Sequence, residues 1–290
     1  MDTLVSIDVA GTSSEAMVER AFGWFALVES VSSRFERESE VMRLSTVVGV
    51  PVRVSAVLFE AVRFAMAVAR ETGGAFDPAI GGLMEARGFN RSYRTGRRVT
   101  SPAASARATF RDIELDAANE TITVHRPLVL DLGAVVKGLA IDLAARELAS
   151  VRNYAIDAGG DVYASGCNPD GQPWRVGVRH PRRPAEVCCV LQLSDVAVCS
   201  SGGYARPAAG GQHHIIDPRT GSSPSELIST TVVAPSAMLA DALSTAAFVM
   251  GAAAGIDLIE RQGADGYALS HNLHVATTHG FWRRAAAPAA

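Results

Sequence analysis

Apolar and polar residues alternate along residues 3–9, TLVSIDV, which is the pattern of a strand with one buried face. The helix predicted next begins with a capping-box pattern formed by Thr12 and Glu15. Its apolar face consists of residues that are mostly three or four positions apart, namely Met17, Ala21, Trp24, Phe25 and Val28. A second helix with a similar apolar face is predicted after Ser55, and it ends at the TGG of residues 72–74.

The middle of the chain is richer in strands. The runs FRDIEL and TITVH, on either side of the polar residues DAANE, predict a hairpin over residues 110–125. Residues 138–150 predict a helix, which follows the small and flexible segment DLGAVVKG. Short apolar runs, separated by proline and glycine, then predict a series of strands between residues 153 and 234.

The C-terminal part contains the clearest helix pattern, with Ser236 as its predicted N-cap and Gly251 as its predicted end. A further helix is predicted over residues 255–263, and GYALS and LHVATT predict closing strands. Strands and helices occur in separate runs rather than in strict alternation. The pattern therefore predicts an α+β fold with mixed or antiparallel sheets and packed helices, not a doubly wound parallel sheet.

Length and composition limit the class of protein. A chain of 290 residues is long enough for about two domains, but single domains of this size are common. We expect one domain over residues 1–290, with a polar surface loop at about 91–108 and a frayed tail at about 283–290. The 27 basic and 30 acidic residues give a net charge of -3, which indicates no nucleic-acid partner.

The apolar segments are interrupted by charges well before the roughly 20 residues that a membrane helix needs. The first residues contain neither a basic segment nor a long apolar stretch, so the sequence predicts no leader and a cytoplasmic protein. The four cysteines have no metal-site spacing, and the simplest interpretation is that they are small buried side chains.

Two polar clusters contain glycine. In GGAFDPAIGGL, Gly73 and Gly74 allow the backbone to approach a ligand closely, and Pro78 restricts Asp77 to an extended conformation. In LDLGAVVKGLAIDLA, a glycine turn and Lys137 come just before the predicted helix, and a helix start with a lysine favours an anion. Each cluster also has a structural interpretation, as a glycine-rich turn in the first and as a structural lysine in the second.

A third cluster lies on the predicted helix at residues 236–251. Asp241 and Thr245 are four positions apart, so their oxygens project from one face of this helix. Mg²⁺ prefers such oxygen ligands and often completes its coordination with a phosphate. The alternative is a polar pair on an exposed face, but the neighbouring residues are small and apolar, and a buried carboxylate needs a partner.

The fourth cluster is HHIIDPRTG, at residues 213–221. Asp217 precedes a proline, which predicts a strand over HHIID followed by a turn. One of His213 and His214 then faces inward, because successive side chains of a strand point to opposite faces. Such a histidine is either a hydrogen-bonded core residue or a candidate acid, base or phosphate contact. Arg219 is a candidate to brace the turn, with Asp217 as its neighbour.

In this order, these clusters resemble the motifs of the ApbE family of FAD:protein FMN transferases. The resemblance covers nearly the whole chain through eight segments, which are MDT, SRFERESEVMRLS, TGGAFDPAIGGL, LDLGAVVKGLAID, NYAIDAGGDVYASG, VCSSGGYAR, HHIIDPRTG and MLADALSTA. It implies a T-fold-like α+β architecture. It also implies a Mg²⁺-dependent enzyme that moves the FMN half of FAD onto a Thr or Ser hydroxyl of an acceptor protein and releases AMP.

The resemblance also implies positions for the site. The metal ligands would be Asp241, Thr245 and the backbone carbonyl of Ala134. The flavin contacts would be Met1, Phe35, Ala75, Phe76, Asp77, Asp131, Lys137 and Ile215. Phe35 stands where tyrosine is common in the family, so a ring is kept and a hydroxyl is missing.

Within this scheme Lys137 offsets charge near the pyrophosphate, and His214 is the hypothetical base or orienting group for the attacking hydroxyl. Two other functions use the same residues. One is a Mg²⁺-dependent FAD pyrophosphatase, in which water replaces the acceptor hydroxyl. The other is a flavin-binding or flavin-delivery protein without catalysis, in which the helix at residues 236–251 serves only for packing.

Overall fold

A computed structural model describes residues 3–12, 14–92, 95–99, 101, 108–205 and 212–285 of the chain. Its centre is a seven-stranded sheet with the strand order β1-β5-β6-β9-β10-β11-β12, in which every neighbouring pair is antiparallel. A three-stranded sheet, β2-β4-β3, and a two-stranded ribbon, β7-β8, are also antiparallel. The predicted α+β class with antiparallel sheets is therefore confirmed.

The strands of the large sheet are β1 (Val5–Val9), β5 (Tyr154–Ala158), β6 (Asp161–Ser165), β9 (Val196–Gly202), β10 (Leu227–Ala234), β11 (Asp265–Ser270) and β12 (Val275–Thr277). The others are β2 (Val52–Arg53), β3 (Ile113–Asp116), β4 (Thr121–Val124), β7 (Trp174–Arg179) and β8 (Val187–Leu193). The α-helices are α1 (Glu15–Ser32), α2 (Glu40–Leu44), α3 (Ala56–Glu71), α4 (Gly81–Ala86), α5 (Gly133–Glu147), α6 (Ala237–Met250) and α7 (Ala252–Arg261). Short 3₁₀ segments are η1 (Phe110–Asp112), η2 (Gly203–Ala205) and η4 (Phe281–Arg284).

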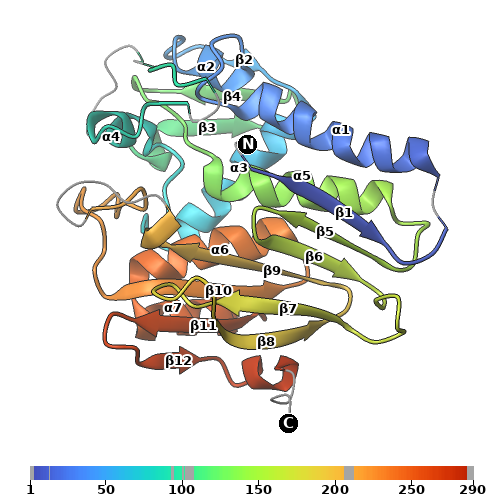
Figure 1. Ribbon diagram of the computed structural model, residues 1–290. Coiled ribbons are helices and arrows are strands. Elements are labelled where there is room, and N and C mark those ends of the chain that lie inside the picture. Colours follow the sequence, from blue (N-terminus) through green and yellow to red (C-terminus); the bar gives the residue numbers. More distant parts are fainter. Residues whose placement is uncertain are drawn as a thin grey trace.

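The two faces of the large sheet are covered by different elements (Figure 1). Alternate residues of its strands, such as Ala197 and Cys199, belong to a core shared with α1, α3, α5 and α6. The residues between them, such as Val198, pack against the β7-β8 ribbon and η4. This alternation is the period-2 pattern of a strand that is buried on both sides. In Figure 1 the small sheet β2-β4-β3 lies at the end of the molecule opposite β12.

Helices α5 and α6 cross at Gly138. A methyl group added to Gly138 would lie 2.5 Å from the Cα atom of Met238, and it would also clash with the carbonyl group of Ala237. Only glycine therefore allows this backbone approach. Because Lys137 and Asp241 lie next to the crossing point, the same contact sets the distance between their side chains.

The start of α6 is fixed to α5 by Asp142. The carboxylate of Asp142 accepts hydrogen bonds from the backbone N–H groups of Ala237, at 2.7 Å, and Met238, at 3.0 Å. Ser236 caps the same turn through the N–H group of Leu239. Burial raises the pKa of Asp142 to about 6, although the two backbone hydrogen bonds oppose this shift.

Most predicted elements are present, with three corrections. The N-cap of α1 is Ser14, whose hydroxyl accepts from the N–H group of Met17, and not Thr12, which is two residues too early. Helix α5 begins at Gly133, because Asp131 accepts from the Gly133 N–H group there. Lys137 therefore lies inside α5 and not before it. The third correction concerns residues 213–217, which form no strand; His213 and Asp217 are isolated bridge residues, and Asp217 pairs with Ser222.

Several predictions concern segments that are only partly described. The described residues of the predicted loop at 91–108 include an isolated antiparallel bridge between Arg91 and Arg98. The other residues of this loop and the tail at 286–290 lie outside the described part. No helix among the described residues is both long and apolar enough to span a membrane.

Replacement of Gly138 by alanine should lower the free energy of unfolding by about 1–3 kcal/mol, because the new methyl group overpacks the α5–α6 crossing. Gly23 is the matched control, since it lies in the middle of α1 and an added methyl group would meet no atom within 4 Å. Gly23→Ala should raise stability by about 0.5–1 kcal/mol through helix propensity. Urea unfolding of both variants measures the difference, and an equal gain in both would contradict the close approach.

Candidate functional site

A cavity of about 800 Å³ lies where α5, α6, the β5-β6 turn and the end of β9 meet. The predicted site residues that line it are Phe35, Ala75, Phe76, Asp77, Asp131, Ala134, Lys137, His214, Ile215, Asp241 and Thr245. Met1, the remaining predicted contact, lies outside the described residues. The fold thus brings segments from all parts of the chain to one cavity.

The charged centre of the cavity consists of Lys137 on α5, Asp161 at the start of β6 and Asp241 on α6. The ammonium group of Lys137 donates a hydrogen bond to Oδ2 of Asp161. Its Nζ atom lies 4.0 Å from Oδ2 of Asp241. Both carboxylates are buried, with exposed fractions of 2% for Asp161 and 4% for Asp241.

The two carboxylates and the ammonium group shift one another's proton affinity. Burial alone would lower the pKa of Lys137, but the negative charges of Asp241 and Asp161 raise it above its ordinary value. Burial raises the pKa of Asp241, which the positive charge of Lys137 opposes and the negative charge of Asp161 reinforces. Lys137 therefore stays positively charged, and Asp241 needs a further positive charge to remain ionised at low cost.

Asp241 and Thr245 fit a divalent cation. Oδ2 of Asp241 is buried and accepts no hydrogen bond, and a buried oxygen of this kind needs a partner. Thr245, one helical turn further along α6, also lines the cavity, and its Oγ1 lies 2.9 Å from Oγ of Ser201. Ala134 lines the same cavity from the first turn of α5.

The described residues contain no group of three or more His, Cys, Asp or Glu side chains that converges as a metal cluster. The predicted ligands of a cation are few: the Asp241 carboxylate, the Thr245 hydroxyl and the backbone carbonyl of Ala134. Few ligands suit Mg²⁺, which usually retains water or takes phosphate oxygens in its remaining positions. The donor set in the cavity is consistent with the predicted metal ligands.

The segment with Ala75, Phe76 and Asp77 forms another part of the cavity wall. The carboxylate of Asp77 accepts from the N–H groups of Ala79 and Phe110, both at 2.9 Å, and these bonds hold the loop against η1. Burial raises the pKa of Asp77, although these backbone hydrogen bonds oppose the shift. The side chain of Asp77 is therefore a structural anchor for this wall of the cavity.

Arg34 is a cavity residue that sequence reasoning missed. Its Nε atom donates to Oδ2 of Asp131 at 2.6 Å, and its guanidinium carbon lies 4.3 Å from the centre of the Phe35 ring. Asp131 in turn accepts from the Gly133 N–H group at 2.9 Å. Arg34 therefore fixes both Phe35 and the start of α5. The only signal in the sequence was its position inside the motif SRFE.

Asp161 was missed as well, although it lies in the motif AGGD. Gly159 and Gly160 have φ values of +67° and +94° and form the tight turn before it. This turn places the Asp161 side chain in the cavity wall, where its Oδ1 atom accepts from the N–H group of Ser200 at 3.2 Å. Its contact with Lys137 depends on the tertiary fold, so the motif alone did not indicate its role.

The segment HHIIDPRTG forms one wall of the cavity through His214, Ile215, Ile216 and Pro218. His213 points elsewhere and makes an edge contact with the ring of Phe248, with 5.4 Å between the ring centres. The predicted turn is present, since Gly221 donates to the carbonyl group of Asp217 at 2.8 Å.

The predicted pairing of Arg219 with Asp217 is confirmed. Nε and one terminal nitrogen of Arg219 each lie 2.9 Å from an oxygen of Asp217. Burial would raise the pKa of Asp217, but the hydrogen bonds from Arg219 lower it overall. Because Arg219 is occupied in this way and is exposed, it braces the turn and does not reach the charged centre.

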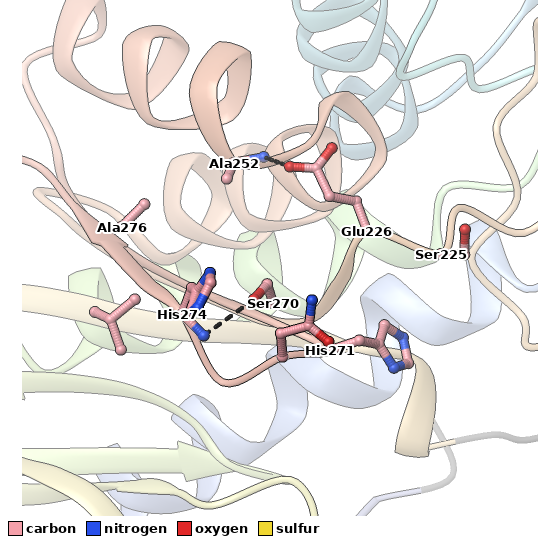
Figure 2. A pocket seen from close by; sticks show the side chains of 9 residues that line it. Ser225, Glu226, Ala252, Ser270, His271, His274 and Ala276 are labelled. Carbon is pink, nitrogen blue, oxygen red and sulfur yellow. Dashed lines mark hydrogen bonds between the residues drawn. The ribbon is translucent and has the colours of Figure 1, made fainter.

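A second cavity, of about 420 Å³, lies between the start of β10, the start of α7 and the β11-β12 hairpin. Figure 2 shows two of its polar side chains bound to the local backbone: Glu226 accepts from the Ala252 N–H group and Ser270 from the His274 N–H group. None of the predicted site residues lines it. The predicted site residues that the structure describes therefore line the larger cavity and not this one.

Comparison with known proteins identifies the family of this chain. A family model described as the ApbE family matches residues 1–268. A relative from Haemophilus influenzae named FAD:protein FMN transferase is 30% identical over 270 residues, which cover 88% of this chain and 77% of the relative. A relative of the same name from Vibrio cholerae is 32% identical over 247 residues, which cover 81% of this chain and 74% of the relative.

Solved structures show the same fold. The crystal structure of the ApbE protein from Thermotoga maritima matches with a TM-score of 0.84 and 28% identity, and covers 99% of this chain and 100% of its own. The flavin transferase ApbE from Vibrio cholerae matches with a TM-score of 0.84 and 25% identity, and covers 98% and 96%. These matches confirm the resemblance that the eight motifs indicated, and the chain belongs to the ApbE family.

Proposed function

We propose that this protein transfers the FMN half of FAD onto a Thr or Ser hydroxyl of an acceptor protein, with Mg²⁺ bound and AMP released. The single observation that carries the proposal is the buried carboxylate oxygen of Asp241, which accepts no hydrogen bond and faces Lys137. The relatives from Haemophilus influenzae and Vibrio cholerae, both named FAD:protein FMN transferase, supply the reaction class.

The dimensions of the cavity support a ligand of this kind. Its volume of about 800 Å³ falls in the range of roughly 300–1,000 Å³ that is usual for small-molecule sites. The ring of Phe35, with the Arg34 guanidinium over it, lines the cavity and suits an aromatic ring system. The charged centre lines the same cavity, and with a cation bound it would suit a diphosphate.

Asp241, Thr245 and the carbonyl group of Ala134 would hold the cation. Bound there, Mg²⁺ would offset the negative charge that grows on the diphosphate oxygens as the bond breaks. Lys137, on α5, would also stabilise this negative charge on the diphosphate, because its ammonium group stays protonated in the cavity. Both groups act through position and charge, which is the main contribution of a protein to phosphoryl transfer.

The attacking hydroxyl must lose a proton, and His214 is the proposed acceptor or orienting group. Its side chain lines the cavity next to Ile215, a proposed flavin contact. An imidazole is a suitable base near neutral pH. The bridge between Asp217 and Ser222 and the ion pair between Asp217 and Arg219 hold the segment that carries it.

The reaction itself can be tested with FAD, Mg²⁺ and candidate acceptor proteins. We expect flavin fluorescence on the acceptor band of a denaturing gel, together with one AMP for each flavin transferred. AMP without a fluorescent acceptor would identify a pyrophosphatase instead, because water would then be the nucleophile. Neither product, with FAD bound, would leave a flavin-binding protein and contradict the proposal.

Replacement of Asp241 by Asn should lower the transfer rate by at least about a hundredfold, since the charge stabilisation that accompanies the cation amounts to several kcal/mol. Thr245→Val should lower it about tenfold to a hundredfold, while Thr245→Ser keeps the hydroxyl and most of the rate. Transfer is measured at a series of Mg²⁺ concentrations. Asp170→Asn, at an exposed loop residue, is the control for general effects of a lost carboxylate. Full turnover in Asp241→Asn would rule out the metal site.

His214→Ala should lower the transfer rate by about 10²- to 10⁴-fold, the usual contribution of a general base. The rates of the wild type and the variant are measured over a broad range of pH. His279→Ala is the control, because the His279 side chain is exposed at the surface. A variant that kept the wild-type rate across a broad pH range would exclude His214 from this role.

A further inference from the structure

Asp161 is the one carboxylate of the charged centre that the proposed reaction does not yet use. The Gly159–Gly160 turn and the sheet hold it rigidly, because its Oδ1 atom accepts from the Ser200 N–H group of the neighbouring strand β9. Its Oδ2 atom accepts from the ammonium group of Lys137. Asp161 has an exposed fraction of only 2%, so the Ser200 N–H group and the Lys137 ammonium group replace water as its hydrogen-bond donors.

The two carboxylates near Lys137 are therefore not equivalent. Asp161 forms the hydrogen bond with the ammonium group, whereas Asp241 lies 4.0 Å from it and keeps a buried oxygen without a hydrogen bond. A side chain as flexible as lysine can turn from one carboxylate to the other by a small rotation.

We propose, on the basis of the function proposed above, that Asp161 is a positioning residue: it binds the ammonium group of Lys137 and so keeps Asp241 open for a divalent cation. The charges support this role. Two carboxylates and one ammonium group leave a net charge of -1 in a buried cavity, which attracts a cation. Without Asp161 the remaining pair, Lys137 and Asp241, would neutralise itself.

Loss of the Asp161 charge should bring the Lys137 ammonium group to Asp241. In Asp161→Asn, the nearest carboxylate to Lys137 is Asp241, 4.0 Å away. The ammonium group would move to Asp241 and bind its carboxylate, because a buried charge is costly without a partner. The cation would then have to displace a charge-assisted hydrogen bond, and we expect its affinity to fall about tenfold to a hundredfold.

The test measures Mn²⁺ binding by the electron paramagnetic resonance signal of the free ion, with the full chain, both alone and with FAD present. The variants are Asp161→Asn, Lys137→Met and the double variant. Asp161→Asn should bind Mn²⁺ more weakly than the wild type. The double variant should recover the wild-type affinity or exceed it, because no ammonium group remains to occupy Asp241.

The double variant separates this role from two others. If Asp161 were itself a ligand of the cation, its loss would weaken binding whether or not Lys137 is present. If Asp161 only supported the fold, removing Lys137 could not restore Mn²⁺ binding. Weak binding in the double variant would therefore overturn the proposal, as would unchanged binding in Asp161→Asn or no Mn²⁺ binding by the wild type.

Three controls accompany the Mn²⁺ binding measurements. Asp157→Asn changes an exposed carboxylate of the same hairpin, which accepts from the Gly160 N–H group, and should leave Mn²⁺ affinity unchanged. Thermal unfolding of each variant shows whether it is folded, and Asp161→Glu should restore part of the affinity by returning the negative charge. A wild type that binds Mn²⁺ but transfers no FMN would contradict the proposed function and leave the positioning role standing.

Discussion

The site depends on the close crossing of α5 and α6 at Gly138. This contact places Lys137 on one helix opposite Asp241 on the other, and Asp142 fixes the start of α6 in the same place. A lysine and an aspartate on separate helices interact strongly only if the helices cannot slide or separate. The absence of a side chain at Gly138 is thus the structural condition for the charged centre.

The carboxylates of the cavity are of two kinds: some are held by hydrogen bonds within the protein, and one has an oxygen that remains available to a ligand. Asp77 and Asp131 are held by backbone or by Arg34, so their oxygens fix the walls. Asp241 retains a buried oxygen without a hydrogen bond, at a cost that the rest of the fold must offset. Unsatisfied buried polar atoms are rare in folded proteins, and their presence in a cavity indicates a ligand.

Sequence patterns predicted α6 accurately, because local chemistry sets both of its ends. Ser236 caps the first turn and Gly251, with a φ of +86°, ends the last. The same local rules failed at HHIID, where a proline bias towards extended backbone did not produce a strand. Among the described residues this segment pairs with no strand, and its backbone pairing is limited to isolated bridges at His213 and Asp217. Extended backbone becomes a strand only when another strand pairs with it.

The sequence alone determined the α+β class, most of the helices and strands, the family motifs and the pairing of Asp241 with Thr245 along one helix. These features depend on residues that are close in the chain. The tertiary structure decided that Lys137 binds Asp161, that Arg34 binds Asp131 and that His213 packs against Phe248 and not in the cavity wall. These contacts join distant segments, and no spacing rule relates residues whose proximity is created only by packing.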